Sequence, residues 1–409
     1  MTDETQRTGP ALLTSARQVV NARRGALLPV VVAVVSTTAL AALHPLVHRR
    51  LGIRWAFDGH DLGVYFSSAR WSVGGGTLYD DVPSEYPLLA NLLFAAARWL
   101  GDLYSSTIRP FYGVWILMAA AAYLYGLYRV AQQGATLAVL VWLSPAAVYF
   151  SLLRYDVFPA LATLLALLAI RRGAEVRGAL WLGVAVALKG YALFLLPAYG
   201  IYLLQRRGFL AAVRIGSLTV LPMAVSLLVV LLFAGWDGVT APFTFHADRG
   251  LNGQSTYDAI NYVLGTDLRF DSTLAQRAAQ GLQVGAALAA AALRPRTFDQ
   301  LVSAFLVAMV GFITFSVFYS PQFVVWILPI ACLAASRRVL VLAIAFSWLS
   351  YLYFPAAYDL TLYGRVDALR GSSLLDLAVL AVAITRVGMI VAALADRWPG
   401  RSATGLPVA

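Results

Sequence analysis

Carboxylate and aromatic side chains gather just after the first apolar run, in the segment Asp58-Gly-His-Asp61-Leu-Gly-Val-Tyr65. An ionised carboxylate held at a membrane surface can take a proton from a hydroxyl group, which is general-base chemistry. We therefore predict Asp61 as a catalytic base, with Asp58 as the alternative. A structural interpretation stays open, because an aspartate at this place can instead cap a helix that starts at Leu62.

Two further clusters place charges next to apolar runs. Arg154 and Asp156 flank Tyr155, and Lys189, the only lysine of the chain, interrupts an apolar stretch. Charged side chains beside membrane helices are costly unless they are paired or functional. We predict that Arg154 and Asp156 contact substrate and that the Lys189 ammonium binds a lipid phosphate. The structural alternatives are a simple Arg154–Asp156 ion pair and a Lys189 that only extends to the headgroup level.

A polar stretch near residue 250 carries His246, Arg249, Asn252 and Gln254. Side chains of these types hydrogen-bond sugar hydroxyls, and an arginine also binds phosphate. We predict phosphate binding by Arg249, and for His246 either donor binding or a role as an alternative proton acceptor. A purely structural histidine is the alternative. Gln322, in the later Ser-Pro-Gln-Phe stretch, is a further candidate for substrate contact.

The rest of the sequence shows that these groups belong to a membrane protein. Of the 409 residues, 60% are hydrophobic and only 12% are charged, which is more apolar than a soluble domain. The net charge of +11 lies mostly in short loops between apolar runs. That pattern indicates membrane orientation and not nucleic-acid binding. The single cysteine excludes an intramolecular disulfide framework.

Apolar runs recur along the whole chain and predict helices. They lie near residues 26–43, 87–100, 110–128, 135–152, 157–170, 178–188, 190–204, 212–234, 278–293, 299–319, 321–335, 339–354 and 374–395. The arginine pairs in the connecting loops all lie on the same side of the membrane only if the 87–100 run does not cross it. We therefore predict that this run lies on the outer membrane surface. The result is an all-α polytopic membrane protein with about 12 transmembrane helices and both termini inside.

The domain organisation follows from the same pattern. We predict a cytoplasmic tail over 1–25, a single transmembrane domain over 26–395 and a cytoplasmic tail over 396–409. Two long outer segments, about 44–109 and 235–277, contain several of the candidate residues, as is typical of functional loops on a rigid scaffold. The chemistry is thus predicted on the extracytoplasmic face of the cell membrane.

The order of these motifs resembles that of the GT-C glycosyltransferases. The similar stretches are the acid before Leu-Gly-Val-Tyr65, Gly-Thr-Leu-Tyr-Asp80, Glu85-Tyr86-Pro, Lys189, His246 to Ser255, and Ser-Pro-Gln322. Within that superfamily the chain is most similar to actinobacterial polyprenol-phosphate-mannose-dependent α-mannosyltransferases. The resemblance covers roughly residues 55–330, and the Arg154–Asp156 segment departs from a Gly-Gln-x-Asn pattern of relatives.

The resemblance implies a GT-C-like bundle with outer juxtamembrane helices. Such a protein moves a sugar, by default mannose, from a polyprenyl-phosphate donor to a glycolipid, lipid-linked or polysaccharide acceptor. Asp61 would deprotonate the acceptor, and Lys189 and Arg249 would hold the donor phosphate. The substrate site would be lined by Tyr65, Glu85, Tyr86, Arg154, Asp156, Asn252, Gln254 and Gln322.

The expected partners are the sugar donor, the acceptor and the lipid bilayer, without nucleic acid. No cofactor is demanded, although Asp58 and Asp61 could share a divalent metal ion with the phosphate. One alternative is another donor, such as a polyprenyl-phosphate arabinofuranose. The other is a flippase or transporter of a lipid-linked sugar, which needs polar groups at the bilayer midplane. Arg386 is the clearest charge in the middle of a predicted span.

Overall fold

The computed structural model describes residues 59–247, 255–266, 273–357 and 373–395. The predicted N-terminal tail, the first predicted span and the C-terminal tail lie outside these residues. Four predicted site residues also lie outside them, namely Asp58, Arg249, Asn252 and Gln254.

The described residues form helices and turns, with one isolated bridge between Leu78 and Val82 and no strand. The predicted all-α class is therefore confirmed for this part of the chain. In chain order, with η for short 3-10 or π helices, the elements are α2 (His60–Ser68), η1 (Ala69–Val73), α3 (Leu88–Asp102), α4 (Ile108–Ala131), α5 (Thr136–Trp142), α6 (Pro145–Leu153), α7 (Val157–Arg171), α8 (Glu175–Leu188), η2 (Gly190–Leu195), α9 (Leu196–Arg207), α10 (Phe209–Ala247), α11 (Thr256–Leu264), α12 (Thr273–Ala292), α13 (Phe298–Thr314), η3 (Pro321–Phe323), α14 (Val324–Ala331), α15 (Arg337–Tyr351), η4 (Leu352–Ala357) and α17 (Ser373–Ala395).

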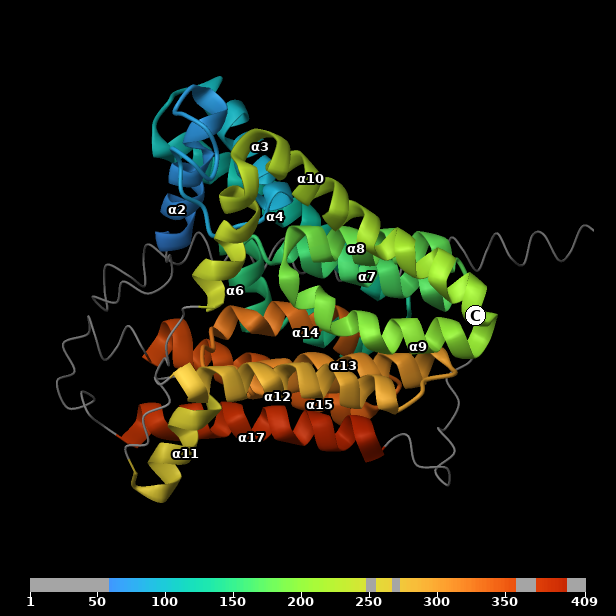
Figure 1. Ribbon diagram of the computed structural model, residues 1–409. Helices are drawn as coiled ribbons and strands as arrows, with labels where there is room; N and C mark the ends of the chain where they lie inside the picture. The colour runs from blue at the N-terminus through green and yellow to red at the C-terminus, as the bar shows by residue number, and fades with distance from the viewer. Residues whose placement is uncertain (1–58, 248–254, 267–272, 358–372, 396–409) are drawn as a thin grey trace, which may run out of the picture.

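The helices build one bundle with a small cap at one end. In Figure 1, α9, α12, α13, α15 and α17 lie side by side with roughly parallel axes, and α7, α8 and α10 pack beside them. The cap consists of α2, η1 and α3, and it packs on α4 at the upper left of the view. The bundle has one large apolar core, whereas the cap contributes a second, aromatic-rich core of its own.

Close packing between the bundle helices depends on small residues. Gly183 on α8 lies against the backbone of Thr219 and the ring of Pro222 on α10, where an added Cβ would overlap both. Gly126 on α4 likewise faces the indole of Trp142. Lipid provides no hydrophobic driving force between spans, so close approach and van der Waals contact hold such helices together.

Several predicted spans are broken helices. α5 and α6 meet at Ser144 with a bend of 47°, because Pro145 disfavours helical backbone in the residue before it. The apolar run 135–152 thus forms two helices that meet at a bend and not one straight helix. α10 breaks at Gly235, whose φ of 63° favours glycine, but helix resumes directly. The predicted loop 235–277 therefore begins as helix as far as Ala247.

The number of membrane spans is the point at which sequence and structure differ most. Among the described residues, 4 helices are each long and apolar enough to cross a membrane, or up to 5 if the bent α5–α6 pair is one span. The structure therefore does not confirm the predicted count of about 12. Helices such as α7, α8 and α13 are shorter than the roughly 20 residues that a perpendicular crossing needs.

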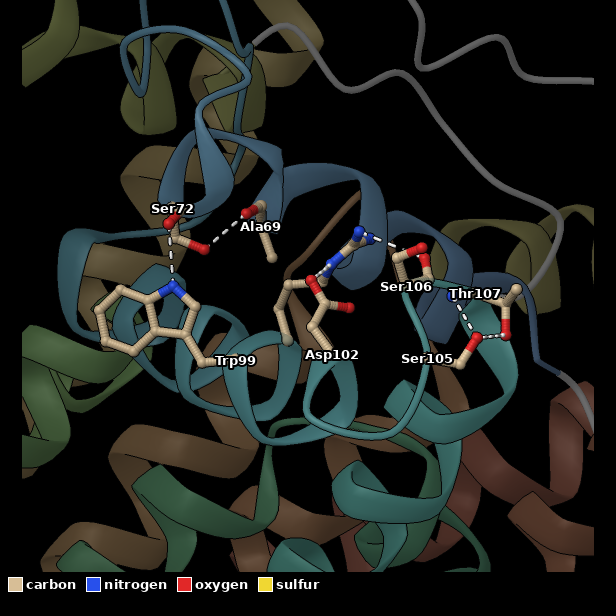
Figure 2. Close-up of polar contacts among 8 residues, drawn as sticks. Ala69, Ser72, Trp99, Asp102, Ser105, Ser106 and Thr107 are labelled. Atoms are coloured by element: carbon tan, nitrogen blue, oxygen red, sulfur yellow. Dashed lines mark hydrogen bonds and ion pairs between the residues drawn. The ribbon is translucent and has the colours of Figure 1, made fainter.

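The run predicted to lie on the outer membrane surface, 87–100, is helix α3 of the cap. Trp99 donates its indole N–H to the Ser72 carbonyl at 2.8 Å, as Figure 2 shows. One residue earlier, Arg98 is paired with Asp102 at 2.8 Å. The indole contact fastens α3 to η1, so the cap is held by specific polar bonds as well as by apolar packing. Its position on the membrane surface stays a prediction.

Candidate active site

A cavity of about 1390 Å³ opens where the cap meets the broken helices of the bundle. One part of its lining is largely apolar and comes from α10, η2 and α13. Polar side chains line another part, and they include His60, Asp61, Glu85, Arg154, Lys189 and Gln322. An apolar hollow with a few convergent polar groups is the usual form of a small-molecule site.

Asp61 lies in the first turn of α2 and lines this cavity, with 23% of its side chain exposed. Arg154 Nε lies 2.9 Å from Asp61 Oδ2 and also donates to Gln322 Oε1 at 2.9 Å. The guanidinium therefore joins three predicted site residues that are far apart in the sequence. Gly59 occupies the cap position of α2, so the alternative that Asp61 caps this helix is wrong.

Asp156 and Lys189 form a second, more buried ion pair. Lys189 Nζ lies 2.7 Å from Asp156 Oδ1, and the indole N–H of Trp326 donates to the same oxygen. The Asp156 side chain has no exposed surface. The Lys189 ammonium also lies 4.3 Å from the ring centre of Tyr155 and 5.0 Å from that of Trp326. Carboxylate and aromatic faces thus hold the ammonium, and Lys189 still lines the cavity.

The simple Arg154–Asp156 ion pair is not formed, so that interpretation is wrong. Arg154 has extended backbone angles, φ −127° and ψ 149°, between α6 and α7. Residues two apart along an extended segment point the same way, but Asp156 already has helical angles. The chain turns between them, so Arg154 reaches α2 and Asp156 reaches Lys189.

Breaks in helices position both cationic groups. Arg154 follows the end of α6, and Lys189 lies in the extended turn between α8 and η2. The break expected between the apolar runs 178–188 and 190–204 is therefore confirmed. Non-helical backbone at membrane depth is tolerated where it lines a cavity, and both breaks meet that condition.

A comparison with protein families decides the class of this protein. A family model for glycosyltransferase family 87 matches residues 85–321, which is more than half of the chain. The chain belongs to glycosyltransferase family 87. This membership confirms the predicted glycosyltransferase class at the level of a GT-C-like family. No curated protein matches the chain at a significant level.

The matched segment of this family 87 enzyme contains both residues of the Asp156–Lys189 ion pair. Of the Asp61–Arg154 pair it contains only Arg154. Arg154, Asp156 and Lys189 lie within residues 85–321, whereas Asp61 precedes them and Gln322 follows directly. The cavity brings Asp61 and Gln322 into contact with Arg154 of the matched segment. The site is therefore completed by residues on both sides of the family match.

Two predicted substrate residues, Tyr65 and Tyr86, belong to an aromatic cluster beneath Asp61. The Tyr65 ring stacks on Phe94 with centroids 4.4 Å apart, and its hydroxyl accepts the Tyr155 backbone N–H at 3.3 Å. Tyr86 meets Tyr65 and Tyr155 edge-on, at 5.5 and 5.2 Å between ring centroids. Both tyrosines are buried, although each also lines the cavity. They form the wall behind Asp61, and their contact with substrate stays a prediction.

Tyr79 lines the cavity near Glu85 and has a positive φ of 72°. This conformation is uncommon for a bulky residue and persists only where neighbouring contacts enforce it. The Tyr79 hydroxyl donates to the Tyr86 carbonyl at 2.7 Å and accepts from the buried Asn91 amide at 3.3 Å. Burial raises the pKa of Tyr79, so its hydroxyl stays protonated and keeps this bond. The bond holds the segment that carries Glu85, which is half-buried at the cavity.

Sequence analysis gave no role to several other residues of the cavity. One of them is Trp326, whose contact with Asp156 depends on tertiary packing. Gln276, Gln280 and Gln283 on α12 also line the cavity. Their spacing of four and three residues places them on one helix face. That spacing is a signal that could have identified them.

His246 lies in the last turn of α10, and only its backbone belongs to the described part. Phe243 and Phe245 beside it line the cavity, so the helix brings His246 close to this hollow. Its predicted role stays a prediction.

From the sequence we expect that the site needs no metal ion, although Asp58 and Asp61 could share a divalent ion with the donor phosphate. Within the part of the chain that the structure describes, no group of three or more His, Cys, Asp or Glu residues could hold a metal ion. Asp58 lies outside that part, so the expectation stays untested. Among the described residues, the Arg154 guanidinium and the Lys189 ammonium bring positive charge to the cavity.

Proposed function

We propose that this family 87 enzyme transfers a sugar, with mannose as the first candidate, from a polyprenyl-phosphate donor to a hydroxyl of a lipid-linked or glycolipid acceptor. The observation that carries the proposal is the joint presence of Asp61 and Lys189 in one cavity. A partly exposed carboxylate suits a base, and a held ammonium suits a phosphate.

The acceptor hydroxyl would enter beside Asp61, whose carboxylate takes its proton. The acceptor oxygen then forms a bond to the anomeric carbon of the sugar, while the bond from that carbon to the phosphate oxygen breaks. Positioned carboxylate bases typically contribute about 10²–10⁴ in rate. Arg154 fixes the carboxylate from one side, at 2.9 Å, and leaves part of it open to the cavity.

The leaving group would be polyprenyl phosphate, which gains negative charge as the bond breaks. Lys189 would stabilise that charge, since a fixed cation in a low-dielectric site needs no reorganisation during the reaction. Asp156 and Trp326 hold the lysine in place. Arg249 is proposed as a second phosphate ligand, on the basis of the motif alone. No metal ion is required in this scheme.

The apolar lining supports a lipid-linked donor. Met223, Leu227 and Val230 from α10 face the same cavity as Phe194 and Phe312. A soluble nucleotide sugar would need polar groups along this wall, whereas an isoprenoid chain needs apolar surface. We place the reaction on the extracytoplasmic side of the cell membrane, because the arginine pairs of the loops favour that orientation.

Orientation can be tested by cysteine labelling, since Cys332 is buried. Ser106→Cys in the cap loop and Ala335→Cys before α15 both replace residues with an exposed side. We expect an impermeant thiol reagent to label the first from outside the cell and the second only after permeabilisation. The reverse pattern would contradict the proposed side of the reaction.

The transport alternative required charges along a path through the membrane. Arg386 is fully buried, its guanidinium carbon lies 4.4 Å from the ring centre of Tyr319, and it does not line the cavity. Its position therefore gives no support to a transport path through this site. Family membership favours transfer in any case.

The function is tested with purified enzyme in lipid, a crude membrane-lipid acceptor and radiolabelled donors. The donors are polyprenyl-phosphate mannose, polyprenyl-phosphate arabinofuranose and a nucleotide-linked mannose. We expect transfer from a polyprenyl-phosphate sugar and none from the nucleotide sugar. Transfer from the nucleotide sugar alone would contradict the donor class. Movement of the labelled lipid across the bilayer without any new product would instead support a flippase.

A further inference from the structure

A second hollow lies away from the candidate active site, between α11, α15 and α17. Its volume is about 1160 Å³, and it shares no lining residue with the active-site cavity. Figure 1 shows α15 alongside α17 and α11 across one end of α17. Its α15 wall begins with Arg337 and Arg338, and its α17 wall runs from Leu380 to Ala395.

The α17 wall of this groove is an exposed apolar stripe. Ile384, Val387 and Val391 are 61%, 48% and 60% exposed, and they follow the three- and four-residue spacing of one helix face. Ala259 on α11 packs against Val379 and Ala383, so α11 closes one end. The groove therefore offers a walled apolar channel and not a flat surface.

The opposite end of the groove is basic. Arg337 and Arg338 begin α15, line the hollow and are exposed. In the described part of the chain neither arginine forms an ion pair, and no acidic side chain lines the groove. Guanidinium groups bind phosphate through several hydrogen bonds. The combination of an apolar channel and two uncompensated arginines selects a ligand with one anionic end and one apolar end.

We propose that this groove binds an anionic phospholipid, with the headgroup phosphate on Arg337 and Arg338 and an acyl chain along α17. From Leu380 to Ala395, α17 rises about 22 Å at 1.5 Å per residue. One leaflet of the hydrocarbon core is about 15 Å thick, so the groove is long enough for one acyl chain. The inference does not depend on which reaction the other cavity performs.

Charge distinguishes an anionic phospholipid from the segments of this chain that could cover the groove instead. The predicted first span is flanked by Arg23-Arg24 on one side and Arg49-Arg50 on the other, and residues 396–401 of the C-terminal tail carry Arg397 and Arg401 against one acid, Asp396, which leaves a net positive charge. Each of these would bring positive charge to Arg337 and Arg338. A phosphodiester brings the opposite charge.

The proposal is tested by native mass spectrometry of the full chain in detergent, with dioleoyl phosphatidylglycerol and dioleoyl phosphatidylcholine added separately. We expect tighter binding of phosphatidylglycerol, and about 30-fold weaker binding in the double variant Arg337→Gln/Arg338→Gln. The double variant Arg337→Lys/Arg338→Lys, which keeps the charge, should retain most of the affinity. Arg171→Gln/Arg172→Gln, at the end of α7, is the matched control and should bind as the wild type does.

Ile384→Trp tests the channel separately, because it fills the groove without changing charge. It should weaken binding of phosphatidylglycerol, and glycerol 1-phosphate alone should not compete. Equal affinity for both lipids, or an undiminished preference in the Arg337→Gln/Arg338→Gln variant, would overturn the proposal. So would full competition by glycerol 1-phosphate, or a dimer whose formation excludes the lipid.

Discussion

The two ion pairs of the site have nearly the same length but different surroundings. Asp61 and Arg154 are 2.9 Å apart, and 23% of the Asp61 side chain is exposed. Asp156 and Lys189 are 2.7 Å apart, and the Asp156 side chain is fully buried. Asp156 Oδ1 accepts from both Lys189 and Trp326, whereas Asp156 Oδ2 has no hydrogen-bond partner.

This difference assigns different tasks to the two carboxylates. A base must reach the substrate hydroxyl, and of the two paired aspartates it is Asp61 that lines the cavity. A buried carboxylate with two strong donors on one oxygen is suited to hold its partner. In the proposed mechanism Asp156 therefore positions Lys189, and Asp61 performs the proton transfer.

The largest effect is expected from Asp61→Asn. Loss of the base should lower kcat by about 10²–10⁴, while Tm stays near the wild-type value because the side chain is partly exposed and asparagine still accepts from Arg154. Asp102→Asn is the matched control, since Asp102 pairs with Arg98 at 2.8 Å outside the cavity. If the Asp61→Asn enzyme transferred sugar at the wild-type rate, Asp61 would not be the base. Asp58 and His246 would then be the next candidates for that role.

Lys189→Met should affect both stability and donor use. It leaves the Asp156 carboxylate buried without its ammonium, which costs about 3–5 kcal/mol of unfolding free energy. Adding Asp156→Asn removes the stranded charge, so the double variant should regain most of the stability but not the donor affinity. Thermal unfolding and donor KM measure the two effects. A double variant with normal donor KM would show that Lys189 is only a structural partner.

Arg154→Met should release Asp61 and Gln322 from their shared donor. A misplaced catalytic group costs about 10² in rate, and we expect this loss in kcat more than in donor KM. Arg154→Lys keeps the charge but loses the planar fork, so it should recover only part of the rate. An Arg154→Met enzyme with normal kcat would show that the pair does not position the base.

The smallest effect is expected from Trp326→Phe. The change removes the N–H donor to Asp156, while a phenyl ring still stacks on Tyr191, whose ring centroid lies 4.6 Å from that of Trp326. A hydrogen bond to a charged group is worth about 1.5–3 kcal/mol, so Tm should fall with little change in kcat. Trp348→Phe, at an exposed position on α15, is the control. Equal Tm values for the two variants would contradict the role of Trp326.

Much of the fold was predictable because helix periodicity and turn residues are local signals. The lone Lys189 before Gly190 marked a helix break that the structure contains. The surface run 87–100 was expected as a helix and forms α3. The predicted glycosyltransferase class came from the order of the motifs, and family membership confirmed it.

The remaining features depend on contacts that the sequence does not display. Arg154 and Asp156 are close in the sequence, yet docking of the cap gives Arg154 a different partner. Trp326 joins Asp156 only through the packing of α14 against α7. The predicted count of about 12 spans is not confirmed, because several of the described apolar runs form short or bent helices whose crossing cannot be read from length and composition.

The most direct test of the division of tasks measures Asp61→Asn and Asp156→Asn side by side, with kcat, donor KM and Tm for each. We predict opposite patterns. Asp61→Asn should lose kcat and keep Tm, and Asp156→Asn should lose Tm and donor affinity with a smaller loss of kcat. The account would be contradicted if Asp156→Asn abolished kcat at an unchanged Tm while Asp61→Asn remained active.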